Sequence, residues 1–373
     1  MVKPILLSSP HMSEENYELE YIHDAFRKNW IAPLGENVNE FEKAVGDYIN
    51  WGHPVALSAG TAALHLSMIL AGVKPGDKVF CQTLTFSASA NPVAYVGAEP
   101  VFIDSDRETW NMDPAALEKA FTIHGKPRAV VAVHIYGNPA KIDEIAAICR
   151  KHGVILIEDA AEALGSEYRG RKCGTFGDFG VLSFNGNKII TTSGGGMLLC
   201  REEADAVHAL KLATQAREPF SWYQHEEIGF NYRMSNICAG IGRGQMKVLQ
   251  KRVAQKRAIC ARYQENLVGL PLEFQPTVEG AASNCWLTAA LLKEGCGVTP
   301  ESLLNALKAE NIDGRPLWKP MHSQPVFAGS SYVTAGAESV SDDLFVRGVC
   351  LPSDTKMTMD DVDRVCDIIR KVF

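Results

Sequence analysis

The chain has 373 residues and a formal net charge of −7 at pH 7. That length is sufficient for two packed domains, and the composition is ordinary for a globular protein. There is no basic stripe for nucleic acid and no run of about 18 apolar residues to span a membrane, so we expect a cytoplasmic protein.

The ten cysteines are scattered singly along the chain. No pair has the spacing of a metal site or of a redox motif. Several occur in apolar strand or helix contexts, where a free thiol packs like a small hydrophobic group. We therefore predict no metal site and no disulfide framework.

Two helices are predicted before the first strand, over residues 12–30 and 37–50. Ser13 is the predicted N-cap of the first helix, and apolar side chains recur at helical spacing in the second. The loop 30–35 between them carries bulky apolar groups. We assign both helices to the first domain.

A short strand at 55–58 runs through a small-residue turn into a predicted helix at 62–71. Gly60 and Thr61 lie on that turn. Backbone N–H groups and the positive end of a helix meet at such a point, and a phosphate fits there. A plain tight turn is the alternative interpretation.

Strands alternate with helices from about residue 55 to residue 200, which predicts an α/β fold with a mostly parallel, doubly wound sheet. Ligands of such sheets bind at the carboxyl ends of the strands. Phe86, Asp159 and Ser183 fall at such ends. The further predicted strands are 78–81, 100–104, 128–134, 154–159, 179–184 and 195–200, and the further predicted helices are 87–96, 114–121 and 141–152.

Lys188 lies on the polar turn Phe184-Asn-Gly-Asn-Lys188, between two strand-like apolar runs. A lysine held on a tight loop between buried strands can lose its hydration, and desolvation lowers the pKa of a lysine. The neutral amine can then form a Schiff base. A solvated loop lysine is the alternative interpretation for this position taken alone.

The pattern changes after residue 200. The polar loop 215–235 is longer than most connections, which suggests a functional loop. A long helix is predicted at 236–269, and we interpret its basic residues as a solvated face. From residue 270 the chain is typical of a smaller α+β domain, in which two prolines prevent 313–322 from forming a helix.

Together these features match the needs of pyridoxal 5'-phosphate. Its phosphate needs amides and hydroxyls, which Gly60, Thr61 and Ser183 offer, and Phe86 offers its ring a flat face. A buried carboxylate, Asp159, would keep the pyridine nitrogen protonated, so that the ring can act as an electron sink. Lys188 would supply the amine for the aldehyde.

Four motifs resemble the DegT/DnrJ/EryC1/StrS family of pyridoxal-phosphate-dependent nucleotide-sugar aminotransferases, and the resemblance covers essentially the whole chain. It implies the fold of the type I enzymes: a mostly parallel seven-stranded sheet flanked by helices, and a smaller C-terminal α+β domain. We place the large domain at 1–250 and the small domain at 251–373. The motifs are 58–66, 158–165, 183–188 and 229–235.

Four segments are most similar to the branch of the family that aminates UDP-2-acetamido-2,6-dideoxy-4-hexulose in the synthesis of diacetylated bacillosamine. This similarity implies that an amino group moves from L-glutamate to the C4 keto group of the UDP-linked sugar, with Lys188 as the catalytic residue. The same chemistry on a GDP- or dTDP-linked keto sugar stays open. The segments are 10–12, 30–35, 185–197 and 315–319.

The resemblance also implies a homodimer with shared active sites, in which Asn231 reaches the phosphate of the partner's cofactor. Glu162 is a further candidate for binding the cofactor and His322 for binding the substrate, and both could equally lie behind the site or in the core. The residues implied near the nucleotide sugar are Asn29, Trp30, Ile31, Ala32, Arg315, Pro316, Leu317 and Trp318.

Two other classes of protein compete with this interpretation. A nucleotide-binding protein without the cofactor would use Gly194–Gly196 as its loop, but the dinucleotide-binding spacing and a following helix are missing. A catalytically silent regulator would need a DNA-binding motif, and we find none. Within the family, a dehydratase offshoot has histidine in place of the lysine, and Lys188 argues against it.

Overall fold

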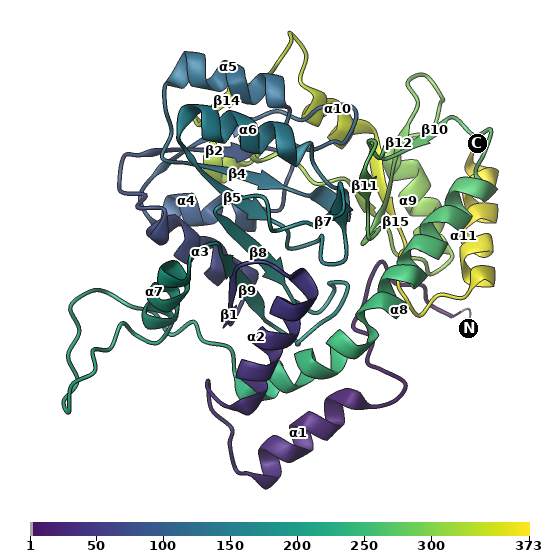
Figure 1. Ribbon diagram of the computed structural model, residues 1–373. Helices are drawn as coiled ribbons and strands as arrows, with labels where there is room; N and C mark the ends of the chain where they lie inside the picture. The colour runs from purple at the N-terminus through teal and green to yellow at the C-terminus, as the bar shows by residue number, and fades with distance from the viewer. Residues whose placement is uncertain (1–2) are drawn as a thin grey trace.

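The computed structural model describes residues 3–373. An eight-stranded sheet lies at its centre (Figure 1). In order across the sheet, the strands are β1 (His53–Leu57), β9 (Gly196–Cys200), β8 (Phe179–Ser183), β5 (Ile155–Asp159), β4 (Ala129–Val133), β2 (Lys78–Gln82), β3 (Glu99–Ile103) and β14 (Ser331–Val333). Strand β9 runs antiparallel to β1 and β8, and the other neighbouring pairs are parallel.

The predicted α/β fold with a mostly parallel sheet is confirmed, but the sheet has eight strands where we expected seven. The additional strand is β14, which joins the edge of the sheet by pairing Ser331 with Val101 of β3. Its three residues are too few to carry a periodic pattern, and it comes from the part of the chain assigned to the small domain.

Helices cover both faces of the sheet because successive strand residues point to opposite sides. Val79 and Cys81 of β2 pack in one core cluster, and Phe80 between them packs in the other. The first face is covered by α3 (Gly60–Leu70), α4 (Asn91–Tyr95) and α7 (Glu203–Ala213), and the second by α5 (Pro114–His124) and α6 (Ile142–His152) (Figure 1).

The N-terminal helices α1 (Tyr17–Arg27) and α2 (Glu36–Ile49) pack against the long helix α8 (Asn236–Asn266). Helix α1 starts later than predicted. The residue that precedes it is Asn16, in a left-handed conformation, and not Ser13. Ser13 still contributes, because its Oγ accepts a hydrogen bond from the Tyr17 N–H at 2.9 Å.

A second, antiparallel sheet lies in the C-terminal part, in the order β10 (Leu272–Phe274), β12 (Thr288–Leu292), β15 (Gly348–Leu351) and β13 (Arg315–Pro316). It shares a core with α9 (Pro300–Ala309), α11 (Met359–Val372) and the end of α8. The predicted boundary between residues 250 and 251 falls inside the continuous helix α8, so the division into two domains stays a prediction.

The remaining elements are β6 (Glu167–Tyr168), β7 (Arg171–Lys172), β11 (Ala281–Ala282), α10 (Val340–Arg347) and the short 3₁₀ turns η1 (Ser87–Ser89), η2 (Ile135–Gly137), η3 (Met321–Ser323) and η4 (Pro325–Phe327).

Within residues 3–373, no helix combines the length and the apolar character that crossing a membrane requires.

Candidate active site

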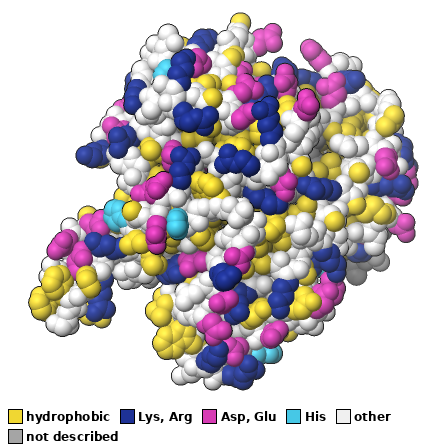
Figure 2. Space-filling model, viewed as in Figure 1, with side chains coloured by type: hydrophobic (Ala, Val, Ile, Leu, Met, Phe, Trp, Pro, Cys, Tyr) yellow, Lys and Arg dark blue, Asp and Glu magenta, His cyan; other side chains and the backbone are white. Residues whose placement is uncertain are grey.

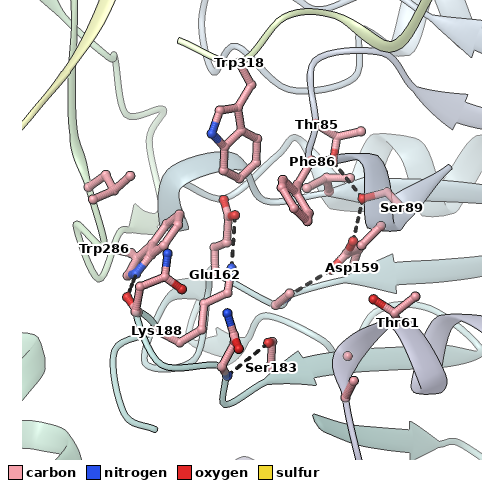
Figure 3. A pocket seen from close by; sticks show the side chains of 18 of the residues that line it. Thr61, Thr85, Phe86, Ser89, Asp159, Glu162, Ser183, Lys188, Trp286 and Trp318 are labelled. Atoms are coloured by element: carbon pink, nitrogen blue, oxygen red, sulfur yellow. Dashed lines mark hydrogen bonds and ion pairs between the residues drawn. The ribbon is translucent and has the colours of Figure 1, made fainter. Parts of the chain in front are cut away.

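A cavity of about 730 Å³ opens at the carboxyl ends of β5 and β8, and Arg315 and Pro316 of the second sheet also line it. Figure 3 shows side chains that line the cavity, among them Lys188, Glu162 and Asp159. The cavity brings together eleven of the residues predicted from the sequence. They are Gly60, Thr61, Phe86, Asp159, Glu162, Ser183, Lys188, Arg315, Pro316, Leu317 and Trp318.

One wall of the cavity is the turn that opens α3. Ala59 precedes the helix in an extended conformation and has no polar side chain to cap it, so the first N–H groups are available to a ligand. The Ser183 hydroxyl lies beside this turn, since a Cβ added to Gly60 would stand 3.5 Å from its Oγ. Strand β9 approaches so closely that a Cβ on Gly196 would lie 2.4 Å from the Gly60 nitrogen, and only glycine fits there. The turn therefore suits a phosphate.

Asp159 ends β5 in the depth of the cavity, with only 4% of its surface exposed. Its Oδ2 accepts a hydrogen bond from Ser89 Oγ at 2.6 Å, and its Oδ1 accepts one from the Ala161 N–H at 3.1 Å. Ser89 lies in turn 2.7 Å from Thr85 Oγ1. Burial raises the pKa of Asp159 in spite of these hydrogen bonds. A protonated ring nitrogen placed beside the carboxylate would offset that cost of burial.

Lys188 reaches into the same space from the turn after β8, and its Nζ lies 3.3 Å from Glu162 Oε1. The indole ring of Trp286 lies 4.3 Å from Nζ, close enough for a cation–π contact. Glu162 is itself fixed, because its Oε2 accepts a hydrogen bond from the Tyr136 N–H at 2.7 Å. Burial raises the pKa of Glu162 to about 7, although the Lys188 ammonium acts in the opposite direction.

Aromatic side chains form the opposite wall. Phe86 is 58% exposed although it is apolar, and its ring centroid lies 5.5 Å from that of Trp318. Trp318 also contacts the Tyr136 ring at 5.2 Å, and its backbone N–H donates a hydrogen bond to the Tyr136 hydroxyl at 2.9 Å. An exposed aromatic face inside a cavity can stack on a flat ligand.

The second sheet contributes the charged part of the cavity. Arg315 and Pro316 form β13, which pairs with β15, and Lys319 follows three residues after Pro316. Arg315 Nη1 lies 2.7 Å from Asp313 Oδ1, and most of the arginine side chain remains exposed. Two cationic side chains are thus available to an anionic ligand.

The other predicted site residues do not line this cavity within the single chain. The segment 29–32 lies between α1 and α2, where Asn236 Nδ2 donates a hydrogen bond to the Trp30 carbonyl at 3.0 Å. Asn231 lies on the loop between α7 and α8 and pairs with Thr214. His322 stacks on Tyr332, with ring centroids 3.7 Å apart, and its Nδ1 lies 2.8 Å from Thr83 Oγ1.

Thr85, Ser89 and Trp286 also line the cavity, and they were not predicted from the sequence. Ser89 belonged to a predicted helix, but the chain forms the 3₁₀ turn η1 there and α4 begins only at Asn91. Pro92 has no N–H to continue a helix from the preceding turn. Lys319 also lines the cavity, and it belongs to the segment 315–319 that the sequence analysis had singled out. Trp286 carries no local signal.

The donor set fits pyridoxal phosphate: N–H groups and hydroxyls for its phosphate, Phe86 for its ring, Asp159 for its ring nitrogen and Lys188 for its aldehyde. This agreement rests on residues of α3, β5 and β8 and of the loops after β2 and β8, which meet in one cavity. The cavity is also large enough to admit a second ligand beside the cofactor.

Comparisons with known proteins agree with this site. The sequence model of the DegT/DnrJ/EryC1/StrS aminotransferase family matches residues 12–370. EpsN of Bacillus subtilis, provisionally named a pyridoxal phosphate-dependent aminotransferase, is 50% identical over 379 aligned positions, which span 100% of this chain and 97% of EpsN. GDP-perosamine synthase of Caulobacter vibrioides is 36% identical, with 99% of this chain and 98% of that enzyme covered.

Among solved structures, the aminotransferase TlmJ of Streptoalloteichus hindustanus superposes with a TM-score of 0.90 at 29% identity, covering 99% of this chain and 98% of TlmJ. The predicted family and cofactor are therefore confirmed, whereas the relatives named here do not single out the UDP-sugar branch. The chain belongs to the DegT/DnrJ/EryC1/StrS aminotransferase family, as a pyridoxal phosphate-dependent sugar aminotransferase.

Proposed function

We propose that this enzyme transfers an amino group from L-glutamate to the C4 keto group of a UDP-linked 2-acetamido-4-keto-6-deoxy sugar, in a bacillosamine-type pathway that supplies glycan biosynthesis and protein glycosylation. The observation that carries the proposal is the cavity that holds Lys188, Glu162 and Asp159 next to Arg315 and Trp318. It combines a group that can react with a carbonyl and groups that can hold a nucleotide diphosphate.

Bound in this cavity, pyridoxal phosphate would supply an aldehyde for amines and a ring that withdraws electrons from the substrate carbon. The Asp159 carboxylate would hold the proton on the ring nitrogen. Lys188 Nζ would take the proton from the α-carbon of the amino donor and deliver it to the aldehyde carbon of the cofactor, on the other side of the amino nitrogen, as general base and then acid. Glu162 Oε1, 3.3 Å from Nζ, orients the amine between these two transfers.

The charged and aromatic residues of the second sheet support a nucleotide-linked substrate. The Arg315 guanidinium matches the geometry of a diphosphate, and Lys319 adds a second positive charge. Trp318 and Phe86 offer faces to the flat rings of cofactor or substrate. None of these groups distinguishes one nucleotide base from another, so the UDP assignment rests on the resemblance of the segments 10–12, 30–35, 185–197 and 315–319.

A GDP-linked keto sugar is the second candidate. The observation that favours it is the similarity to GDP-perosamine synthase of Caulobacter vibrioides over nearly the whole length of both chains. The chemistry at the keto carbon would be the same, and the difference would lie in the residues that contact the base.

We further propose a homodimer with shared active sites. The loop between α7 and α8 projects from the body of the molecule (Figures 1 and 2). It exposes Phe220, Trp222, Tyr223 and Ile228, the last with 86% of its surface. A second copy would cover these apolar groups, and Asn231 at the base of the loop would then reach the partner's cofactor phosphate. The cytoplasmic location stays a prediction.

The test is the visible absorption spectrum of the purified protein with pyridoxal phosphate. L-glutamate is added and removed, and then a UDP-, GDP- or dTDP-linked 4-keto sugar is added in parallel samples. We expect the band of the lysine-bound cofactor to disappear with glutamate and to return with the UDP sugar. Return with the GDP sugar alone would select the second candidate, and absence of any band would refute the role of Lys188.

A further inference from the structure

A buried lysine lies behind the active-site cavity. Lys256 is on α8, and only 2% of its surface is exposed. The interpretation of the basic residues of this helix as a solvated face is therefore wrong for Lys256, and also for the buried Arg252. No carboxylate among residues 3–373 forms an ion pair with the Lys256 ammonium group, and Asp354 and Cys285 are the titratable groups that face it. Burial lowers the pKa of Lys256 to about 7. Burying such a group costs free energy unless hydrogen bonds offset the hydration that it loses.

Those hydrogen bonds reach two distant segments of the chain. Lys256 Nζ donates to the Trp286 carbonyl at 3.0 Å and to Ser8 Oγ at 3.0 Å. The side chains of both residues donate in turn to the same atom, the carbonyl oxygen of Asn187. Ser8 Oγ donates to it at 2.9 Å, and Trp286 Nε1 donates to it at 2.7 Å. We refer to Lys256, Ser8, Trp286 and Asn187 as the Lys256 network.

The Lys256 network ends at the reacting amine. Asn187 directly precedes Lys188, so fixing its carbonyl fixes the peptide from which the Lys188 side chain extends. Trp286 acts on the other end of that side chain, since its ring lies 4.3 Å from Nζ. Figure 3 shows the indole of Trp286 beside Lys188 and the Glu162 carboxylate joined to the end of the lysine side chain by a dashed line.

We propose that Lys256 is a positioning residue, which acts through Trp286 and Asn187 to keep the Lys188 amine directed at Glu162 and the cavity. The proposal rests on the proposed function, in which Lys188 is the reacting amine. It explains why a lysine lies in this interior position. Its long side chain and several donors join the N-terminal segment, α8 and the segment before β12 at one point, which a shorter polar residue would not span.

The test compares two substitutions on the same face of α8. Lys256→Met keeps an unbranched side chain and removes the donors. Arg252→Met is the matched control, one turn earlier and equally buried, because Arg252 donates to the Met12 carbonyl at 2.8 Å and not to the Lys256 network. Both variants are loaded with pyridoxal phosphate and studied with and without L-glutamate.

For Lys256→Met we expect kcat to fall about tenfold while the KM for L-glutamate stays within about twofold, because a misplaced reacting group costs rate more than binding. We also expect the pH midpoint of the visible band, measured without substrate, to fall by about half a unit, since a displaced Trp286 ring no longer stabilises positive charge at the lysine nitrogen. Arg252→Met should change neither quantity.

Wild-type values in Lys256→Met, or equal changes in Arg252→Met, would overturn the proposal. If Lys256→Met does not fold, the pH midpoint is measured in Ser8→Ala and in Trp286→Phe instead. Each of these substitutions removes one hydrogen-bond donor to the Asn187 carbonyl. A lowered midpoint in both supports the proposal, and an unchanged midpoint in both refutes it. Failure of the proposed function would look different: the wild-type protein itself would form no band.

Discussion

Glu162→Gln should stabilise the cofactor-free protein at alkaline pH and leave it nearly unchanged in acid. Glu162 is buried at the wall of the cavity, and burial raises its pKa from 4.5 to about 7. Between these values the folded chain binds a proton that the unfolded chain has released, so the stability contributed by this group falls as the pH rises toward 7. Glutamine does not titrate, and its side-chain oxygen can still accept the hydrogen bond from the Tyr136 N–H.

The magnitude follows from the difference between the two pKa values. A shift of about 2.5 units at about 1.4 kcal/mol per unit gives a penalty of roughly 3 kcal/mol above pH 7. Because part of it is present at pH 5, the free energy of unfolding of Glu162→Gln relative to wild type should rise by roughly 2–3 kcal/mol between pH 5 and pH 8.

Denaturant unfolding of the cofactor-free proteins at the two pH values measures this difference, with Glu338→Gln as the control for an exposed carboxylate. A difference between Glu162→Gln and wild type that does not change with pH would refute the reasoning. So would a Glu162→Gln protein that is less stable than wild type at pH 8, since the contact with Lys188 would then outweigh the cost of burial.

Three further predictions concern the reaction. Lys188→Ala should abolish turnover and hold the cofactor only non-covalently, so that dialysis removes it; wild-type activity would contradict the assignment. Asp159→Asn should lose activity by about a hundredfold or more, because it removes a buried charge next to the ring nitrogen of the cofactor. This loss should far exceed the loss in Glu162→Gln. Equal losses of kcat/KM in the two variants would mean that the partner of the ring nitrogen is misassigned. Arg315→Ala should raise the KM for the nucleotide sugar about tenfold, as expected for the loss of one charge-assisted contact, and leave the half-reaction with L-glutamate unchanged. An altered glutamate half-reaction in stopped-flow absorption would count against a role of Arg315 in binding the nucleotide sugar.

The part of the site that lies at the ends of parallel strands could be predicted from the sequence. Buried strands are continuous apolar runs, and the polar residue that ends each run is then placed at a known edge of the sheet. Asp159 directly ends β5, and Lys188 follows β8 after a short turn, so both were found by position in the chain.

The rest of the site depends on contacts that no local pattern records. Ser89 reaches Asp159 because η1 replaces a regular helix, and Trp286 meets Asn187 across about a hundred residues of chain. The contacts of His322 with Thr83 and Tyr332 likewise depend on the packing of β14 on the edge of the sheet. For Asn231 the single chain gives no contact with the cavity, and its predicted role requires a second copy.

The residues that we propose for cofactor binding and those that we propose for sugar binding come from two different sheets of the cavity wall. Asp159 and Ser183 end strands of the eight-stranded sheet, whereas Arg315 and Pro316 form β13 of the four-stranded sheet. Strand pairing in β13 uses the backbone, so its side chains can change without moving β5 or β8. Under the proposed function, this arrangement allows the sugar-binding strand to differ between this chain and the GDP-perosamine synthase that it matches over nearly its full length. It follows that exchanging residues 315–319 with those of that relative should change the KM for the nucleotide sugar and preserve the glutamate half-reaction.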